Sequence, residues 1–311
     1  MKVERIPFTT REAWLAARRQ DVTASAAAAL LGCHPFTSAY ALWAEKTGRI
    51  SDEAADSGPL RRGRLLEPVA VQLLADERPG WCIHSNRDYF RDRIARLGAT
   101  PDTIVRCPER GLGTVQIKSV ERSVFAAKWR DADTREVEVP LAYAIQAITE
   151  AHLLGASWAA VAALVVSHDI ELAILDVPVH PGVVARVREA VAEFWAMVES
   201  GDRPDPDWRR DAALAASLHG GDGSALDLSG DNALPALLDE RTELKARIKA
   251  DEARVAEIDT EIRSKVGLAA LAMLPGWKIS LRAVETKAYQ VAARVTRPIR
   301  ITRLQQKDAA A

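Results

Sequence analysis

A run of ten residues, WAAVAALVVS (158–167), constrains the fold most strongly, because nine of its ten side chains are apolar. A continuous apolar run of this length is typical of a strand buried on both faces. It follows a helical stretch, LAYAIQAITEAHLLG (141–155), and precedes a second strand and a long helical pattern at 181–201. We therefore expect an α/β fold, with a mixed, twisted central sheet flanked by helices and a functional site at one sheet edge.

Other helical and strand patterns precede this run. Helices are expected within 10–32, interrupted by a turn at 21–25, and over 38–49 and 62–77. Short, alternating, turn-bounded stretches between 81 and 120 predict a strand meander. The expected inward stripe of the 62–77 helix is Leu65, Leu66, Val69, Leu73 and Leu74. That of the 181–201 helix is Val183, Val187, Val191, Phe194 and Val198.

The composition narrows the class of protein. The 311 residues suffice for one large domain with an appendage, or for two domains. The formal net charge is -1, so a nucleic-acid binder of this composition has to concentrate positive charge locally. Three cysteines, none in a C-x-x-C, fit a reducing cytosol and argue against a four-cysteine metal site. With no signal-peptide pattern and no long apolar run, we expect a cytoplasmic protein without a membrane partner.

The C-terminal third differs in character. We expect a core at 1–208, a Gly-, Asp- and Ser-rich linker at 209–233, an amphipathic or coiled-coil helix at 234–266 and a basic segment at 267–311. Arg241 and Asp251 interrupt the apolar 3/4 spacing of the helix, which either pairs in a coiled coil or packs on its own domain. The basic segment is either a solvated strand or a nucleic-acid contact.

Two strand patterns, GATPDTIV (98–105) and GTVQIKSV (113–120), carry the strongest chemical signal. Gln116 and Lys118 share one strand face, and antiparallel pairing of the two strands would bring Asp102 beside them. An acid, a second oxygen ligand and a lysine suit metal-dependent phosphodiester hydrolysis. Mg²⁺ prefers hard oxygen ligands, neutralises phosphate charge and lowers the pKa of the attacking water, while the lysine orients that water or balances charge.

These motifs resemble the PD-(D/E)xK nuclease superfamily, and within it the YqaJ-like viral recombinases and lambda-type exonucleases. RGRLLEP (62–68) places a carboxylate on a helix before the strands, where the superfamily carries a further metal ligand. LAYAIQ (141–146) matches the family's Y-x-x-Q placement. WLAARRQDVTAS (14–25) resembles its W…R…TAS signature, and EFWAMVESGDRPDPD (193–207) resembles the close of the YqaJ-like core. The resemblance covers roughly residues 8–208.

The resemblance implies a Mg²⁺-dependent exonuclease, with Mn²⁺ as the alternative metal, that hydrolyses one strand of duplex DNA from 5′ to 3′ in phage-type recombination. It further implies a single-strand annealing protein as partner and a homo-oligomer. The catalytic set it implies is Asp102, Gln116, Lys118 and Glu67, with Glu67, Asp102 and Gln116 on the metal. It assigns the DNA 5′-phosphate to Arg18 and Ser25, and a supporting role to Tyr143 and Gln146.

One position departs from the family pattern. The family usually has Glu or Asp where this chain has Gln116, and a neutral amide oxygen weakens cation binding without abolishing it. Because Glu67, Asp102 and Lys118 are all in place, we expect retained activity. The alternatives are a structure-specific endonuclease, a DNA-binding or assembly protein without turnover, and an oligomeric scaffold built on the 234–266 helix.

Overall fold

The computed structural model describes residues 2–50, 57–131, 133–221, 223–285, 293, 299 and 301. The chain divides into two compact units, Met1–His219 and Gly220–Ala311. The helices of the first unit are α1 (Arg11–Arg19), α2 (Ala24–Leu30), α3 (Ala39–Lys46), α4 (Gly58–Glu77), α5 (Arg122–Lys128), α6 (Leu141–Leu154), α7 (Pro181–Ser200) and α8 (Ala212–Leu218). Its strands are β1 (Glu4–Ile6), β2 (Val22–Thr23), β3 (Cys82–Ser85), β4 (Tyr89–Asp92), β5 (Leu97–Ala99), β6 (Thr103–Cys107), β7 (Gly111–Glu121), β8 (Trp158–Val166) and β9 (Ile170–Val177).

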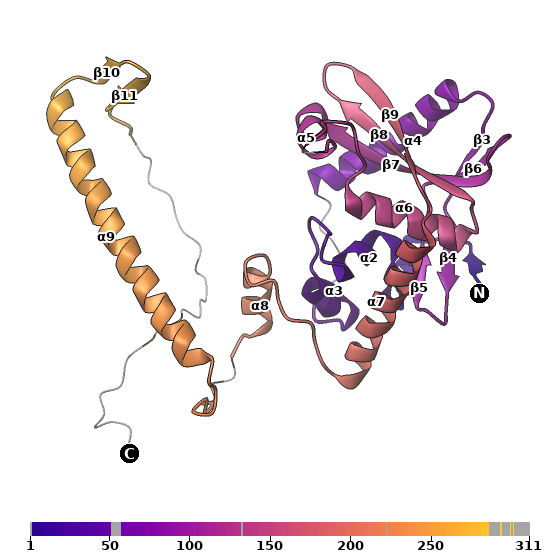
Figure 1. The fold of residues 1–311 in the computed structure, drawn as a ribbon, viewed down its shortest axis with the longest axis horizontal. Helices are drawn as coiled ribbons and strands as arrows, with labels where there is room; N and C mark the ends of the chain where they lie inside the picture. The colour runs from indigo at the N-terminus through magenta and orange to yellow at the C-terminus, as the bar shows by residue number, and fades with distance from the viewer. Residues whose placement is uncertain are drawn as a thin grey trace. The chain divides into compact units, whose positions relative to one another are not determined.

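The main sheet has the strand order β3-β6-β7-β8-β9 (Figure 1). The long strand β7 pairs parallel with β8, and the other neighbours pair antiparallel. The parallel pair is joined by the crossover that contains α6, as parallel neighbours require. The expected α/β fold with a mixed central sheet flanked by helices is therefore confirmed.

Strand β8 contributes to two hydrophobic layers, one on each face of the main sheet. Because successive side chains of a strand point to opposite faces, its residues divide between the helices on either side of the sheet. One face packs with Ala70 and Leu74 of α4, and the other packs with Ala147, Ile148 and Ala151 of α6. The β8 residues on the α4 side are Ala160, Ala162 and Leu164, and those on the α6 side are Ala159, Val161, Ala163 and Val165.

A second, smaller sheet has the order β1-β4-β5-β2. Its buried residues share a core with α2, α3, α6 and α7. The expected single meander between 81 and 120 is therefore wrong: β4 and β5 form a hairpin in the small sheet, while β3, β6 and β7 belong to the main sheet. All these strands alternate and end in turns, so their sequences do not distinguish which sheet each one joins.

The inward faces of the two long helices follow the sequence to different degrees. In α7, Val187, Val191 and Phe194 are buried as expected. In α4, Leu65 and Val69 are 65% and 39% exposed, so the expected stripe is wrong at these two positions, whereas Leu66, Leu73 and Leu74 face the core as expected. Ala70 and Leu74, one helical turn apart, are the fully buried residues of that helix.

The second unit contains α9 (Leu234–Val266) and the antiparallel hairpin β10 (Leu271–Leu274) and β11 (Trp277–Ser280). The helix has the bounds expected for the 234–266 segment. Within the expected 209–233 linker, Ala212–Leu218 is the helix α8 of the first unit. The basic residues expected beyond 282 all lie outside the described residues. None of the helices in the described ranges is long and apolar enough to cross a membrane.

Candidate active site

Asp102 lies at the point where β6 begins beside β7. The two strands are held in register there by Thr103, whose hydroxyl donates to the carbonyl of Val115 at 2.8 Å and accepts from its N–H at 3.1 Å. The Asp102 carboxylate accepts the backbone N–H of Ile117 at 2.8 Å. The predicted pairing thus brings Asp102 beside Gln116 and Lys118, although on the central strand β7 and not on an edge strand of the sheet.

Burial dominates the electrostatics of Asp102. It raises the pKa of this carboxyl above its ordinary value, while Lys118, the Ile117 N–H and the Gln116 side chain act in the opposite direction. The Gln116 side chain is 3% exposed, and its Oε1 atom is buried without a hydrogen-bond partner among the described residues. A buried amide oxygen with an unused lone pair, next to a carboxylate, is suited to a cation.

Glu67 projects from α4 toward the same place. Burial and the nearby Asp102 carboxylate together raise the pKa of Glu67 from 4.5 to about 7, against the attraction of Lys118 and Arg87. A carboxyl whose pKa is raised by burial and by a second carboxylate gains stability when a positive charge lies between the two groups. The structure therefore brings together Glu67, Asp102, Gln116 and Lys118.

Lys118 is positioned by helix α6. Its Nζ donates to Gln146 Oε1 at 3.1 Å and lies 5.0 Å from the centre of the Tyr143 ring. The Tyr143 ring in turn packs at 5.5 Å against Trp129. Tyr143 and Gln146 thus hold the ammonium group by a cation–π contact and a hydrogen bond.

Glu150 is a member of this network that the sequence analysis missed. Gln146 Nε2 donates to Glu150 Oε1 at 2.8 Å, and Glu150 is 1% exposed with its Oε2 buried and without a partner among the described residues. Burial first, and Asp102 second, raise the pKa of Glu150 to about 8. The sequence signal was present, because Tyr143, Gln146 and Glu150 follow the i, i+3, i+7 spacing of one helix face.

A cavity of about 340 Å³ opens beside Lys118. Its lining combines apolar and aromatic groups, among them Phe36, Leu141 and Trp129, with cationic groups such as Arg62 and Lys128. Arg62 donates to Glu121 at 2.9 Å. The cavity therefore offers flat apolar surface next to the carboxylate cluster, with positive charge along its wall.

Arg18 and Ser25, expected at the 5′-phosphate, lie on α1 and α2. The Arg18 guanidinium lies 4.2 Å from the Trp14 ring centre, and its charge acts to lower the pKa of both Glu150 and Tyr89. Ser25 Oγ is 3.0 Å from Thr23 Oγ1. Arg18 is thus within electrostatic reach of Glu150 on α6.

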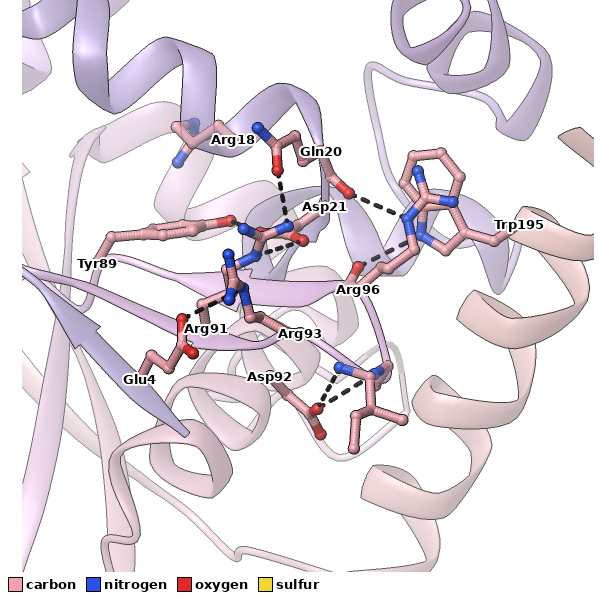
Figure 2. A network of polar contacts seen from close by, with 12 residues as sticks. Glu4, Arg18, Gln20, Asp21, Tyr89, Arg91, Asp92, Arg93, Arg96 and Trp195 are labelled. Atoms are coloured by element: carbon pink, nitrogen blue, oxygen red, sulfur yellow. Dashed lines mark hydrogen bonds and ion pairs between the residues drawn. The ribbon is translucent and has the colours of Figure 1, made fainter. Parts of the chain in front are cut away.

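A buried polar network fixes the turn that follows Arg18 (Figure 2). The Asp21 carboxylate accepts from Arg91 Nε at 3.0 Å and from the Tyr89 hydroxyl at 3.1 Å. Arg91 also donates to Gln20 Oε1 at 3.1 Å. The guanidinium carbon of Arg96 lies 3.3 Å from the centre of the Trp195 ring, and Arg96 Nε donates to the Gln20 carbonyl at 3.2 Å. The end of α1 is therefore anchored to the small sheet and to α7.

The oxygen atoms of the site fit a hard cation such as Mg²⁺. Acidic residues alone do not supply them, because one is the amide oxygen of Gln116. Among the residues that the structure describes, no three histidine, cysteine, aspartate or glutamate side chains are grouped to hold a metal. The oxygen donors available are the Glu67 and Asp102 carboxylates and the unpartnered Gln116 Oε1. Two carboxylates with a neutral oxygen match the few protein ligands that Mg²⁺ uses while it retains several waters.

Comparison with known families gives a match over this part of the chain. Residues 13–157, just under half of the chain, match the model of the YqaJ-like viral recombinase domain. This segment of the chain is similar to the YqaJ-like viral recombinase domain. The range includes Arg18, Glu67, Asp102, Lys118 and Gln146, so the resemblance inferred from the motifs is confirmed over the segment that builds the site.

Three solved structures resemble the YqaJ-like domain and its surroundings. An alkaline exonuclease (LHK-Exo) from Laribacter hongkongensis has 21% identity and a TM-score of 0.45, and its complex with dAMP has 22% and 0.49; each match covers 67% of this chain and 99% of the other. A phage-related exonuclease from Haemophilus somnus 129PT has 14% identity and a TM-score of 0.38, over 58% of this chain and 96% of the other. No curated protein matches the sequence. The family resemblance rests on the YqaJ-like match over residues 13–157.

Proposed function

We propose that this chain is a metal-dependent DNA exonuclease of the viral-recombinase type, which uses Mg²⁺ or Mn²⁺ to hydrolyse one strand of duplex DNA from its 5′ end. The observation that carries the proposal is the grouping of Glu67, Asp102 and Gln116 beside Lys118. The YqaJ-like match over residues 13–157 supports the same reaction class.

Glu67, Asp102 and Gln116 would hold the cation. When bound, Mg²⁺ supplies charge neutralisation at the phosphate and a lowered pKa for the attacking water. The Ile117 N–H keeps one oxygen of Asp102 oriented, so that the other is available to a ligand. Gln116 contributes its buried Oε1, which gains in cation binding the partner that it lacks in the protein alone.

Lys118 supplies the fixed positive charge of the site. Held by Gln146 and by the Tyr143 ring, its ammonium stabilises negative charge that develops on the phosphate during hydrolysis. Because the lysine is held in position before substrate binds, little reorganisation is needed in the transition state. The aromatic cavity beside Lys118 would accept a base of the strand being degraded, by stacking on its apolar walls.

Arg18 and Ser25 would select the 5′ end. A guanidinium binds a terminal phosphate with two parallel hydrogen bonds, and a serine hydroxyl adds a third. The anchored turn after Arg18 keeps this pair in place relative to the small sheet. A single-strand annealing protein as partner, assembly into a homo-oligomer and a role in phage-type recombination remain predictions from the family resemblance.

Digestion of linear duplexes that carry either a 5′-phosphate or a 5′-hydroxyl tests the proposal. With Mg²⁺ or Mn²⁺, the wild type should release nucleotides faster from phosphorylated ends. Lys118→Ala should lower the rate by about a hundredfold or more, as removal of a transition-state donor does. Arg18→Ala should abolish the end preference while it leaves the metal affinity unchanged. Lys249→Ala, on the exposed surface of α9, is the matched control and should retain the wild-type rate.

Each alternative function gives a different result in the same assay. Cleavage of closed circular duplexes would indicate an endonuclease and not an exonuclease. Binding of duplex DNA without any cleavage, with either metal present, would indicate a DNA-binding protein without nuclease activity. Equal rates for the wild type and Lys118→Ala would show that β7 does not carry the active site.

A further inference from the structure

The long helix α9 has an apolar stripe that is exposed along its length. It contains 33 residues, none of them buried. Leu237, Leu244, Ile248, Val255 and Ile258 are 59%, 43%, 55%, 57% and 41% exposed. Most helices in proteins are stabilised by packing of an apolar face. We therefore expect the exposed stripe of a helix of this length to pack against another surface. The helix is continuous from end to end (Figure 1).

The stripe follows the heptad repeat of a coiled coil. Its positions alternate in steps of three and four residues, which is the spacing of the a and d positions along a two-helix seam. Arg241 occupies one a position and Asp251 one d position, and both interrupt an otherwise apolar series. Between 234 and 258 the a positions are Leu234, Arg241, Ile248 and Val255, and the d positions are Leu237, Leu244, Asp251 and Ile258; the apolar series continues at Ile262, an a position beyond this segment.

The two charged interruptions fit each other in an antiparallel pair. In an antiparallel coiled coil an a residue of one helix faces a d residue of the other. When two copies of α9 are centred on Ala246, Arg241 of each copy faces Asp251 of the other, and Ile248 faces Leu244. The remaining layers pair Leu237 with Val255 and Leu234 with Ile258. Six of the eight layers are then apolar, and the other two each contain one ion pair.

A parallel pair would place like charges together in the seam. Arg241 would face Arg241 and Asp251 would face Asp251, which leaves uncompensated charges in a desolvated layer. The flanking e and g positions favour the parallel arrangement, but they are solvent-exposed and such pairs contribute little. The complementary parallel pairs are Glu240 with Lys245, Arg247 with Glu252 and Arg254 with Asp259. The interior layers therefore decide the orientation.

We propose that α9 is a docking surface for a second copy of this chain, bound as an antiparallel two-helix coiled coil centred on Ala246. The overlapping segment, 234–258, is roughly 36 Å long at the rise of an α-helix. This surface is independent of the nuclease assignment, because it contains no residue of the Glu67–Asp102 site. Arg241 and Asp251 act as specificity residues that fix register and direction at some cost in stability.

Disulfide trapping in the full-length chain tests the orientation. Leu244→Cys and Ile248→Cys are prepared as separate chains in a Cys82→Ser background, mixed under reducing conditions and then oxidised. Antiparallel pairing predicts a disulfide between Cys at 244 of one chain and Cys at 248 of the other, identified by peptide mass spectrometry. Each variant alone should give little cross-linked product, because neither position faces itself.

The outcomes separate the possible partners of the stripe. Homodisulfides formed by each variant alone would show a parallel dimer and overturn the antiparallel pairing. Absence of cross-links in every mixture would show that α9 packs on its own chain or on a different protein. Sedimentation gives a second readout: Ile248→Glu should weaken self-association by roughly tenfold or more. Ala246→Glu, on the outer face of the same helix, should leave self-association unchanged, and equal loss in both variants would also overturn the proposal.

Discussion

Gln116 contributes a neutral oxygen at a point where two carboxylates already oppose each other. In the absence of a cation, a third carboxylate there would add repulsion to Glu67 and Asp102, whose pKa values burial already raises. In the presence of a cation, the same charge would strengthen binding. If the proposed metal site is correct, Gln116 therefore balances the stability of the metal-free protein against its affinity for the metal.

Substitution of Gln116 should reveal this balance. Gln116→Glu should lower the melting temperature of the metal-free protein and tighten Mg²⁺ binding by about tenfold or more, because a full charge replaces a dipole near the cation. Gln116→Leu, which removes the oxygen, should weaken Mg²⁺ binding. Titration calorimetry with Mg²⁺ and thermal unfolding with a chelator measure the two effects. Equal affinities in all three proteins would show that position 116 does not face the metal.

Glu150 makes the stability of the first unit depend on pH. Its pKa is raised to about 8 in the fold from an ordinary value of 4.5, so the folded protein holds a proton that the unfolded chain has lost. The stabilising contribution is therefore complete below about pH 4.5 and is lost as pH rises toward 8. At alkaline pH, an ionised and almost fully buried carboxylate remains.

Glu150→Gln should remove this dependence. Between pH 5.5 and 8.5 the wild type should lose more unfolding free energy than the variant, by on the order of a few kcal/mol, since each pKa unit corresponds to about 1.4 kcal/mol. The amide oxygen of the new residue can still accept from Gln146. Urea unfolding at the two pH values, with a chelator present, measures the difference. Parallel pH profiles would argue that Glu150 titrates near its ordinary pKa.

The residues of the site were predictable to the extent that they follow strand or helix periodicity. Asp102 beside Gln116 and Lys118 follows from the pairing of two strands joined by a short turn, and Tyr143 and Gln146 follow from helix spacing. Glu150 was missed because a glutamate near the end of a helix usually faces solvent. Its burial belongs to the side of α6 where Gln146 bonds Lys118 of β7, and no local pattern specifies that contact.

At the scale of elements, the approach of β7 to β8 depends on Gly113. A Cβ atom at this position would overlap with the indole ring of Trp158 on the neighbouring strand. That ring is held in place by Trp81 at 5.0 Å and by Arg110 at 4.2 Å. The parallel pair that carries Gln116 and Lys118 therefore begins at a position that accepts no side chain.

Gly113→Ala should destabilise the first unit by about 1–3 kcal/mol, the usual cost of overpacking a core. Gly63→Ala is the matched control: it lies within α4 with open space around it, and should be neutral or stabilising by up to about 1 kcal/mol. Denaturant unfolding of both variants provides the comparison. A neutral Gly113→Ala would mean that Trp158 can move without loss of packing.

Element types were more predictable than sheet membership. The apolar run at β8 predicts a strand buried on both faces, and the periodic patterns of α6 and α7 predict helices buried along one stripe. The sequence does not show that β4 and β5 form a separate hairpin, since their alternation resembles that of β6 and β7. Its place in the small sheet is set by the pairing of β1 with β4 and of β2 with β5, across long sequence separations.

At the scale of the molecule, the boundary of the first unit lies beyond the expected end of the core at 208. Asp211 is buried and accepts from Ser38 Oγ at 2.8 Å and from the Asp207 N–H at 2.8 Å. Leu214 and Leu218 of α8 pack against the same core as α2 and α7. The sequence does not predict this helix, because the surrounding segment is rich in glycine, aspartate and serine. Its own seven residues are also too few to show a helical period.

Two truncated chains should show where the unit ends. A chain ending at His219 should unfold cooperatively, with a melting temperature close to that of the first transition of the full chain. One ending at Trp208 loses Asp211 and α8, and should melt lower by on the order of 5 °C, as loss of about 2 kcal/mol implies for a unit of this size. Calorimetry of the two chains decides the boundary, and identical transitions would place it at 208.

The alanines of β8 have a consequence for how this protein tolerates mutation. Ala160 and Ala162 meet α4, which carries Glu67, and Ala159 and Ala163 meet α6, which carries Gln146 and Glu150. The thickness of one small-residue strand thus separates the helices that furnish the two halves of the site. A methyl group added at one of these alanines would therefore push α4 or α6 outward and move one half of the candidate site away from the other. The spacing of the site depends in this way on alanines that are not part of it.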